Sequence, residues 1–289
     1  MPSLKEIKER ITSIKSTQKI TSAMKMLASS KLKKAQYQMN CFLPYQRKLN
    51  AMLNSFLFCI TDFKSDLTKK REIKRIALVI FSSNTSLCGT FNSNIIKLFN
   101  ETISKYRYLN QKDIEVYTVG KKIEDYVRKL TFPLKVEGNH TQLIEKPNFA
   151  RLKQLADKLL SDFLNQKIDK VELLYNHCKN AIFQTTNLEP YLPIQMKQPK
   201  STSHADYIIE PDKDTVLNTL ILRSLYSKIY AVLLNSVIAE HTARLVSMQI
   251  AIDNADEILE ELTIQHNKQR QQTITNDLLD IISSSEALK

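Results

Sequence analysis

Residues 215–250 read TVLNTLILRSLYSKIYAVLLNSVIAEHTARLVSMQI and form the centre of a longer stretch, 212–289, that contains neither glycine nor proline. Apolar side chains recur along this stretch at helical spacing: Leu222, Leu225, Ile229, Val232, Ala239, Ala243, Val246 and Ile250. The pattern predicts one unbroken α-helix. Such a helix would be roughly 110 Å long, which is more than a globular domain needs, so it requires an equally long partner.

The composition is that of a folded and largely helical protein. Of the 289 residues, 43% are hydrophobic and 25% are charged, which argues against disorder, and only three are glycine, which indicates few tight turns. Cysteines and histidines are scattered without the spacing of a metal site or a disulfide framework, so we predict reduced thiols and no metal. We find no long apolar run and no signal segment, and we expect a soluble, cytosolic chain.

Positive charge is concentrated at the N-terminus. The net charge of the whole chain is +12, and residues 1–36 contain nine lysines and arginines against two glutamates, hence +7. A basic helix can contact nucleic acid, an anionic membrane surface or an acidic protein, and charge alone does not choose between these partners. An ordinary solvated helix face fits the same pattern.

The N-terminal region predicts the partner helix. Residues 3–43 lack glycine and proline, and apolar residues recur at heptad spacing near both ends of this segment. Ser3 and Glu6 form a capping-box pattern that marks the start of the helix. We expect the helix to continue past Pro44, with a kink, to residue 60, followed by a charged linker over 61–73.

The central region alternates between short apolar runs and amphipathic segments. We expect strands or extended pieces at these positions: 76–81 (IALVIF), 114–119, 134–136, 171–175 and 207–210. We expect helices at these positions: around 95–106, 121–130 and 148–165. The proline-containing segment 184–203 is predicted to be extended with turns. Residues 74–210 therefore form an α/β domain, and the flanking helices 1–60 and 211–289 pack as an antiparallel pair.

No pattern of catalytic or nucleotide-binding residues is evident. The loop 82–90 (SSNTSLCGT) contains one glycine, so both the dinucleotide and the P-loop fingerprints are missing, and we predict no cofactor-binding residue. Cys88 is expected to be a packed thiol. The carboxylates between 253 and 261 follow a single helix, which indicates a solvated acidic stripe or a match for basic side chains. We predict no catalytic and no metal-binding residue.

Several segments resemble the γ subunit of F-type ATP synthases over the whole chain and in the same order. The resemblance rests on these segments: 1–36 with TQKIT and AMKM, LCGTFNSNI (87–95), YNHCKNAI (175–182), YIIEP (207–211), AEHTARLVSM (239–248), DNA (253–255) and NKQRQQTIT (267–275). The resemblance implies a mixed α/β protein, with a long antiparallel coiled coil of the terminal helices and a central Rossmann-like domain.

The resemblance further implies a non-catalytic rotor shaft that turns inside a ring of three α and three β subunits, one copy per complex. The rotor would couple proton flow to ATP synthesis at the β subunits and would also contact the ε subunit and the ring of c subunits. The motif match assigns these residues to contacts with β subunits: Met24, Lys25, Arg244, Arg270, Gln271 and Thr275. It assigns these residues to an apolar bearing tip: Ile281, Ile282 and Leu288.

Some features depart from the family pattern. Asn84, Thr85 and Ser86 replace the usual Asp-Arg-Gly, so any ion pair of that arginine is lost, and Ser283–Ser285 replace small glycine and alanine residues. Without the cysteine-bearing insertion of the chloroplast form, we expect no thiol regulation. The absence of an arginine-rich presequence favours a peripheral location on the cytoplasmic side of a bacterial (inner) membrane. The alternative is a basic coiled-coil scaffold that binds nucleic acid or an anionic membrane.

Overall fold

The computed structural model describes residues 3–59, 66–69, 71–130, 134–138, 140–178, 184–194, 210 and 212–287. Two compact parts are present: a smaller part of Met1–Ser29 with Leu245–Lys289, and a larger part of Ser30–Arg244. Both contain segments of the two long helices, α1 (Leu4–Cys59) and α6 (Lys213–Ala287).

The start of α1 is set by the predicted capping box. The backbone N–H of Ser3 donates to the carboxylate of Glu6 over 3.1 Å, and the N–H of Glu6 donates to the Ser3 hydroxyl over 3.3 Å. These two bonds satisfy donors that a helix N-terminus otherwise leaves free. The helix continues through Pro44, as predicted.

In the smaller part, α1 and α6 are antiparallel. The Gln18 amide donates to Asp256, and the ammonium group of Lys25 donates to Gln249. Since the higher number in α1 pairs with the lower number in α6, the two chains run in opposite directions. Small and apolar side chains are buried on both helices, for example Ala28 at 2% and Met248 at 5% exposure.

The larger part repeats the antiparallel arrangement. The Phe42 ring meets the Tyr230 ring edge to face with 5.0 Å between centroids, and the Ser224 hydroxyl lies 3.4 Å from the Asn50 amide oxygen. An 18-residue window of α6 is apolar enough to cross a membrane by length and composition, but 56% of that window is buried within the structure. Such burial is typical of a core helix.

The larger part also contains a five-stranded sheet with the order β3-β2-β1-β4-β5. The strands are β1 (Ile76–Phe81), β2 (Ile114–Val119), β3 (Lys135–Glu137), β4 (Lys170–Cys178) and β5 (Gln184–Leu192). The first four are parallel, and β5 is antiparallel to β4. Every residue of β1 is buried, which explains why its sequence is apolar without alternation.

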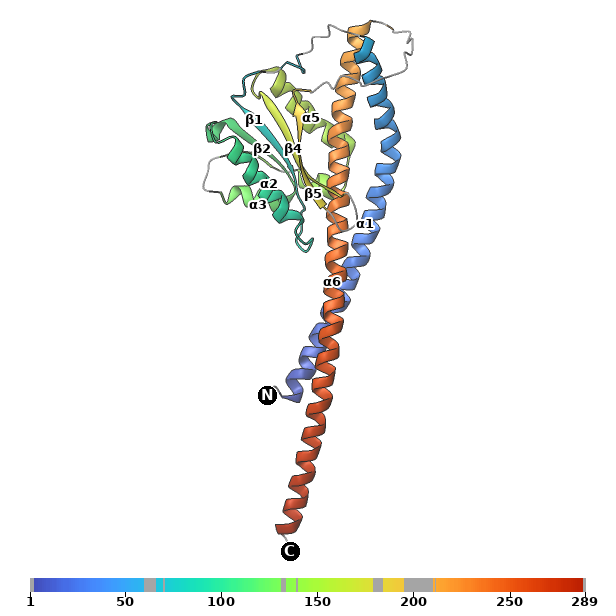
Figure 1. Ribbon diagram of the computed structural model, residues 1–289, viewed down its shortest axis with the longest axis vertical. Coiled ribbons are helices and arrows are strands. Elements are labelled where there is room, and N and C mark those ends of the chain that lie inside the picture. The colour runs from blue at the N-terminus through green and yellow to red at the C-terminus, as the bar shows by residue number, and fades with distance from the viewer. Residues whose placement is uncertain are drawn as a thin grey trace. The chain divides into compact units, whose positions relative to one another are not determined.

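Helices cover both faces of this sheet (Figure 1). The helices of this part, besides α1 and α6, are α2 (Phe91–Lys105), η1 (Gln111–Asp113), α3 (Lys121–Arg128), α4 (Thr141–Glu145) and α5 (Phe149–Leu164). Ile76, Leu78 and Ile80 pack with residues of α2 and α3, whereas Ala77 and Val79 pack with residues of α5 and α6. Strand alternation thus builds two cores, one on each face.

The mixed α/β fold with long terminal helices is confirmed, while some local predictions differ. The predicted bounds of β1 and β2 are those observed, but α4 was not predicted, and 184–192 is a strand where we expected an extended segment with turns. Pro190 is tolerated because β5 is an edge strand, and the pairing shifts register opposite Val171 and Glu172. Of the predicted strand 207–210, residues 207–209 lie outside the described residues, and Glu210 lies outside any strand.

Candidate functional site

A buried ion pair joins two turns of α6 in the larger part. One guanidinium nitrogen of Arg244 lies 2.7 Å from the Glu240 carboxylate, and the two side chains are only 9% and 5% exposed. Their spacing of four residues places both on one face of the helix. Burial raises the pKa of Glu240, while the hydrogen bond from Arg244 opposes this shift.

The same arginine holds the loop that follows β1. Its second terminal nitrogen donates to the Thr85 hydroxyl over 2.8 Å and to the Thr85 and Ser86 carbonyls over 3.3 and 3.4 Å. Arg244 therefore connects α6 to a segment 159 residues earlier in the chain. Since arginine presents several donors in a rigid plane, it can bond a carboxylate and this loop at once.

The loop has a defined internal structure. The Ser83 hydroxyl donates to the Thr85 carbonyl over 2.7 Å, and Leu87 and Gly89 have φ angles of 65° and 56°. Cys88 is 2% exposed, and the Asn92 amide lies 3.2 Å from its sulfur. Burial raises the pKa of the Cys88 thiol, so the sulfur stays protonated at neutral pH. The prediction that Cys88 is a packed thiol is confirmed.

His241 adjoins this ion pair and was not singled out from the sequence. It is 6% exposed, and its Nδ1 has no hydrogen-bond partner among the described residues. Its pKa is lowered to about 4, mainly by burial and to a smaller extent by the positive charges of Arg244 and Lys31. The ring is therefore neutral at pH 7 and offers one N–H donor and one acceptor.

The expected contact residues fall in different places. Met24 and Lys25 are half-buried on α1, and the Lys25 ammonium group donates to Gln249. Arg244 is 8% exposed and is engaged within the chain as described, so its expected contact with another subunit stays a prediction. The hydrogen bonds of Arg244 could have been anticipated in part, because a glutamate four residues earlier is a common helical ion-pair spacing.

The remaining expected contacts lie on the distal segment of α6. Arg270, Gln271 and Thr275 are exposed and span less than two turns, so the helix brings these three together. Ile281 and Ile282 are 63% and 55% exposed, while Leu288, the third residue of the expected tip, lies outside the described residues.

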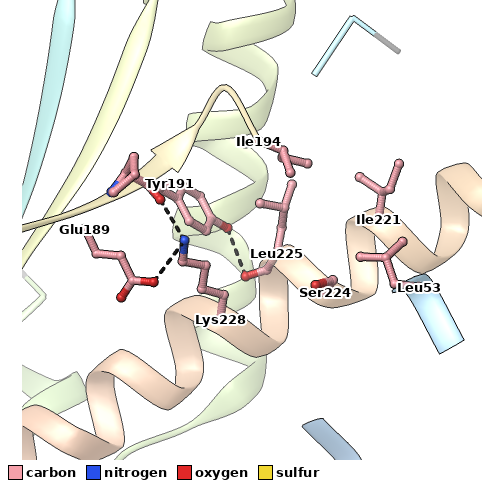
Figure 2. A pocket seen from close by; sticks show the side chains of 9 residues that line it. Leu53, Glu189, Tyr191, Ile194, Ile221, Ser224, Leu225 and Lys228 are labelled. Atoms are coloured by element: carbon pink, nitrogen blue, oxygen red, sulfur yellow. Dashed lines mark hydrogen bonds and ion pairs between the residues drawn. The ribbon is translucent and has the colours of Figure 1, made fainter. Parts of the chain in front are cut away.

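A cavity of about 260 Å³ lies between the sheet edge, α6 and Leu53 of α1 (Figure 2). Its polar groups already have partners within the chain. The Lys228 ammonium group donates to the Pro190 carbonyl over 2.6 Å and lies 3.1 Å from Glu189. The Tyr191 hydroxyl donates to the Leu225 carbonyl over 3.2 Å. These contacts fix β5 to α6 and leave few free polar atoms for a ligand.

Among the described residues, no group of three His, Cys, Asp or Glu side chains is placed to hold a metal ion. The acidic residues of the predicted stripe on α6 are all exposed: Asp253, Asp256, Glu257, Glu260 and Glu261. Two of them accept hydrogen bonds, from Gln249 and Gln18.

Comparison with known proteins gives consistent results. The family described as ATP synthase matches residues 3–288. The chain is 99% identical to an ATP synthase gamma chain of Azobacteroides pseudotrichonymphae genomovar. CFP2, over 100% of both chains. It is 46% identical to the ATP synthase gamma chain of Phocaeicola vulgatus, over 99% of this chain and 100% of that one.

Solved structures share the fold at low sequence identity. A chain in the Euglena gracilis mitochondrial ATP synthase (OSCP/F1/c-ring, rotational state 3) is 17% identical, with a TM-score of 0.68, over 99% of this chain and 94% of that one. A chain in the Tetrahymena thermophila mitochondrial ATP synthase (central stalk/c-ring) is 23% identical, with a TM-score of 0.59, over 80% of this chain and 99% of that one.

Proposed function

The chain belongs to the family of ATP synthase gamma chains, and from this membership we propose that it is the central rotor of a proton-driven ATP synthase. The observation that carries the proposal is the identity of 99% over the full length of a gamma chain. As the central-stalk subunit, it couples proton flow through the membrane sector to ATP synthesis by rotation inside a ring of α and β subunits. Family membership gives no support to the alternative of a nucleic-acid or membrane scaffold.

The paired helices suit a part that transmits torque. In both parts of the chain, α1 and α6 run antiparallel and bury side chains such as Ala28 and Met248 between helices. Two packed helices resist twisting and bending better than one, because a deformation of either must also disturb the buried contacts.

Contacts with the β subunits are proposed for the exposed residues Arg270, Gln271 and Thr275 of α6, and for Met24 and Lys25 of α1. These side chains have polar or flexible ends, which suits contacts that must form and break in each rotation. For Arg244, the internal hydrogen bonds support a contact made indirectly, through the Thr85 loop that it holds. Ile281 and Ile282, with Leu288, would form an apolar tip that turns inside an apolar sleeve.

Catalysis is proposed to lie with the β subunits, and the gamma chain is non-catalytic. The further proposed partners are the α subunits, the ε subunit and the c-subunit ring, with one copy of this chain per complex. The complex would lie on the cytoplasmic side of a bacterial inner membrane, with this chain peripheral to the lipid.

Co-purification tests the assignment. A tagged full-length chain, expressed with its α, β and ε partners, is expected to be recovered with three α and three β subunits per copy. ATP hydrolysis by membranes that contain the whole complex is expected to pump protons. Recovery without α and β subunits, together with DNA binding that weakens steeply with salt, would instead support the scaffold alternative.

The contact residues can be tested in the same complex. Arg270→Ala is expected to lower the coupling of ATP hydrolysis to proton pumping, because its guanidinium would bond the β subunits. Lys268→Ala is the matched control: Lys268 is also exposed and cationic, but it lies two residues away on another helix face. Equal effects of the two variants would argue against a specific contact at Arg270.

A further inference from the structure

A second cavity, of about 190 Å³, lies where three elements of the larger part meet. Lys31, Lys34 and Gln38 line it from α1, His241 lines it from α6, and Lys146 lines it from the segment that follows α4. Three lysines from two separate segments of the chain thus line one concave site. A liquid-density water occupies about 30 Å³, so there is room for a small hydrated solute.

The cationic groups at this cavity are not neutralised within the chain. Lys31, Lys34 and Lys146 form no ion pair and no side-chain hydrogen bond in the described ranges. The cavity is also lined by the carboxylate of Glu145, whose Oε1 accepts a hydrogen bond from the Asn84 amide over 3.2 Å. The residues that line the cavity therefore have a net positive formal charge.

The His241 ring adds a polar group to this lining. His241 is 6% exposed, lines the cavity and forms no hydrogen bond within the described residues. Its Nδ1 is enclosed by the protein, so a solute in the cavity would meet the ring through Nε2, and buried polar groups in folded proteins nearly always have a hydrogen-bond partner. An anion is the partner that would also match the three ammonium groups.

We propose that this cavity binds a phosphate-type oxyanion, held by Lys31, Lys34 and Lys146 with a hydrogen bond from the His241 ring. The oxyanion is either free phosphate or the phosphate group of a nucleotide. It would bridge α1, α6 and the segment after α4, and so would stabilise the packing of the helix pair against the α/β domain. This site is separate from the proposed rotor function and does not depend on it.

The test is a titration of the full-length chain with inorganic phosphate and, in parallel, with ADP, at constant ionic strength. NMR signals of isotope-labelled histidine rings report binding, with the His241 signals assigned from a His241→Gln variant. Saturable movement of the His241 signals is expected. Tighter binding of phosphate would identify free phosphate as the ligand, and tighter binding of ADP would identify a nucleotide phosphate.

The matched variants are Lys34→Gln and Lys33→Gln, which remove the same charge from adjacent exposed positions of α1, only one of which lines the cavity. Lys34→Gln is expected to weaken binding about three- to tenfold, as for the loss of one charge-assisted contact, and Lys33→Gln is expected to leave it unchanged. The proposal is overturned if His241 does not respond to either ligand, or if both variants weaken binding equally.

Discussion

Replacing Arg244 by methionine would test whether this arginine acts within the chain. Methionine keeps an unbranched stem but removes the charge that pairs with Glu240 over 2.7 Å and the bonds to the Thr85 loop. Both side chains of the pair are less than 10% exposed, so the carboxylate would be left buried without a counter-charge. Breaking one side of a buried pair costs about 3–5 kcal/mol, which is the expected loss in free energy of unfolding near pH 8.

The loss in free energy of unfolding caused by Arg244→Met should be smaller at acidic pH. Burial already raises the pKa of Glu240, and removal of Arg244 takes away the largest opposing interaction. At a pH between the pKa of Glu240 in the unfolded state and its higher pKa in the native state, the native state binds more protons than the unfolded state. The stability of the variant therefore falls as pH rises through this range. Arg244→Met is therefore expected to be less destabilised relative to the wild type at pH 5 than at pH 8.

Urea unfolding of the full-length chain, followed by circular dichroism at both pH values, measures these differences. Glu240→Gln combined with Arg244→Met is the control, because it removes the buried charge and should recover much of the stability. A loss below about 1 kcal/mol at pH 8, with no dependence on pH, would refute the reasoning. If Arg244→Met showed so small a loss in stability and yet uncoupled ATP hydrolysis from proton pumping in the complex, Arg244 would act mainly by direct contact with another subunit.

Three further predictions concern separate features. His241→Gln should lose less stability than the wild type as the pH falls from 6.5 to about 4, by at most about 3 kcal/mol, because the wild-type histidine has a lowered pKa and resists protonation only in the folded state; an unchanged pH profile in thermal unfolding would contradict this. Gly120→Ala should cost at least about 2 kcal/mol in urea unfolding, since φ is 115° and a Cβ would lie 2.3 Å from the Ser82 carbonyl oxygen, whereas Gly138→Ala would meet only the movable Glu124 side chain. Leu245→Pro should break α6 at a cost of about 3 kcal/mol or more and uncouple ATP hydrolysis from proton pumping, while Leu245→Ala keeps coupling; normal coupling in the proline variant would argue against the shaft.

The sequence predicted those elements whose own residues determine them. The strand 76–81 is wholly apolar and buried on both faces, so its bounds were predicted correctly. The strand 184–192 depends on pairing with β4, and its polar residues and Pro190 give no comparable local pattern. The helix Thr141–Glu145 has only five residues, which is too short for a periodic pattern to be recognised.

The site was harder to predict because its contacts join distant segments. The pairing of Glu240 with Arg244 lies within one helix and could be inferred from spacing, but the Thr85 hydroxyl is 159 residues away. The burial of His241, and the effect of the Lys31 charge on its pKa, likewise depend on α1 packing against α6. Motif resemblance identified the exposed Arg270 and the buried Arg244 alike, and it gave no information about which of its residues form contacts within the chain.

The loop 84–86, which departs from the family pattern given above, is joined to α6 through Arg244. The loss of any ion pair of the replaced arginine at Thr85 stays a prediction, and in this chain Arg244 has its carboxylate partner on its own helix, in Glu240. The loop therefore needs to supply only neutral acceptors, which the Thr85 hydroxyl and the two carbonyls provide. Because the charge is balanced inside α6, the side chains of this loop can vary as long as the acceptors stay in place.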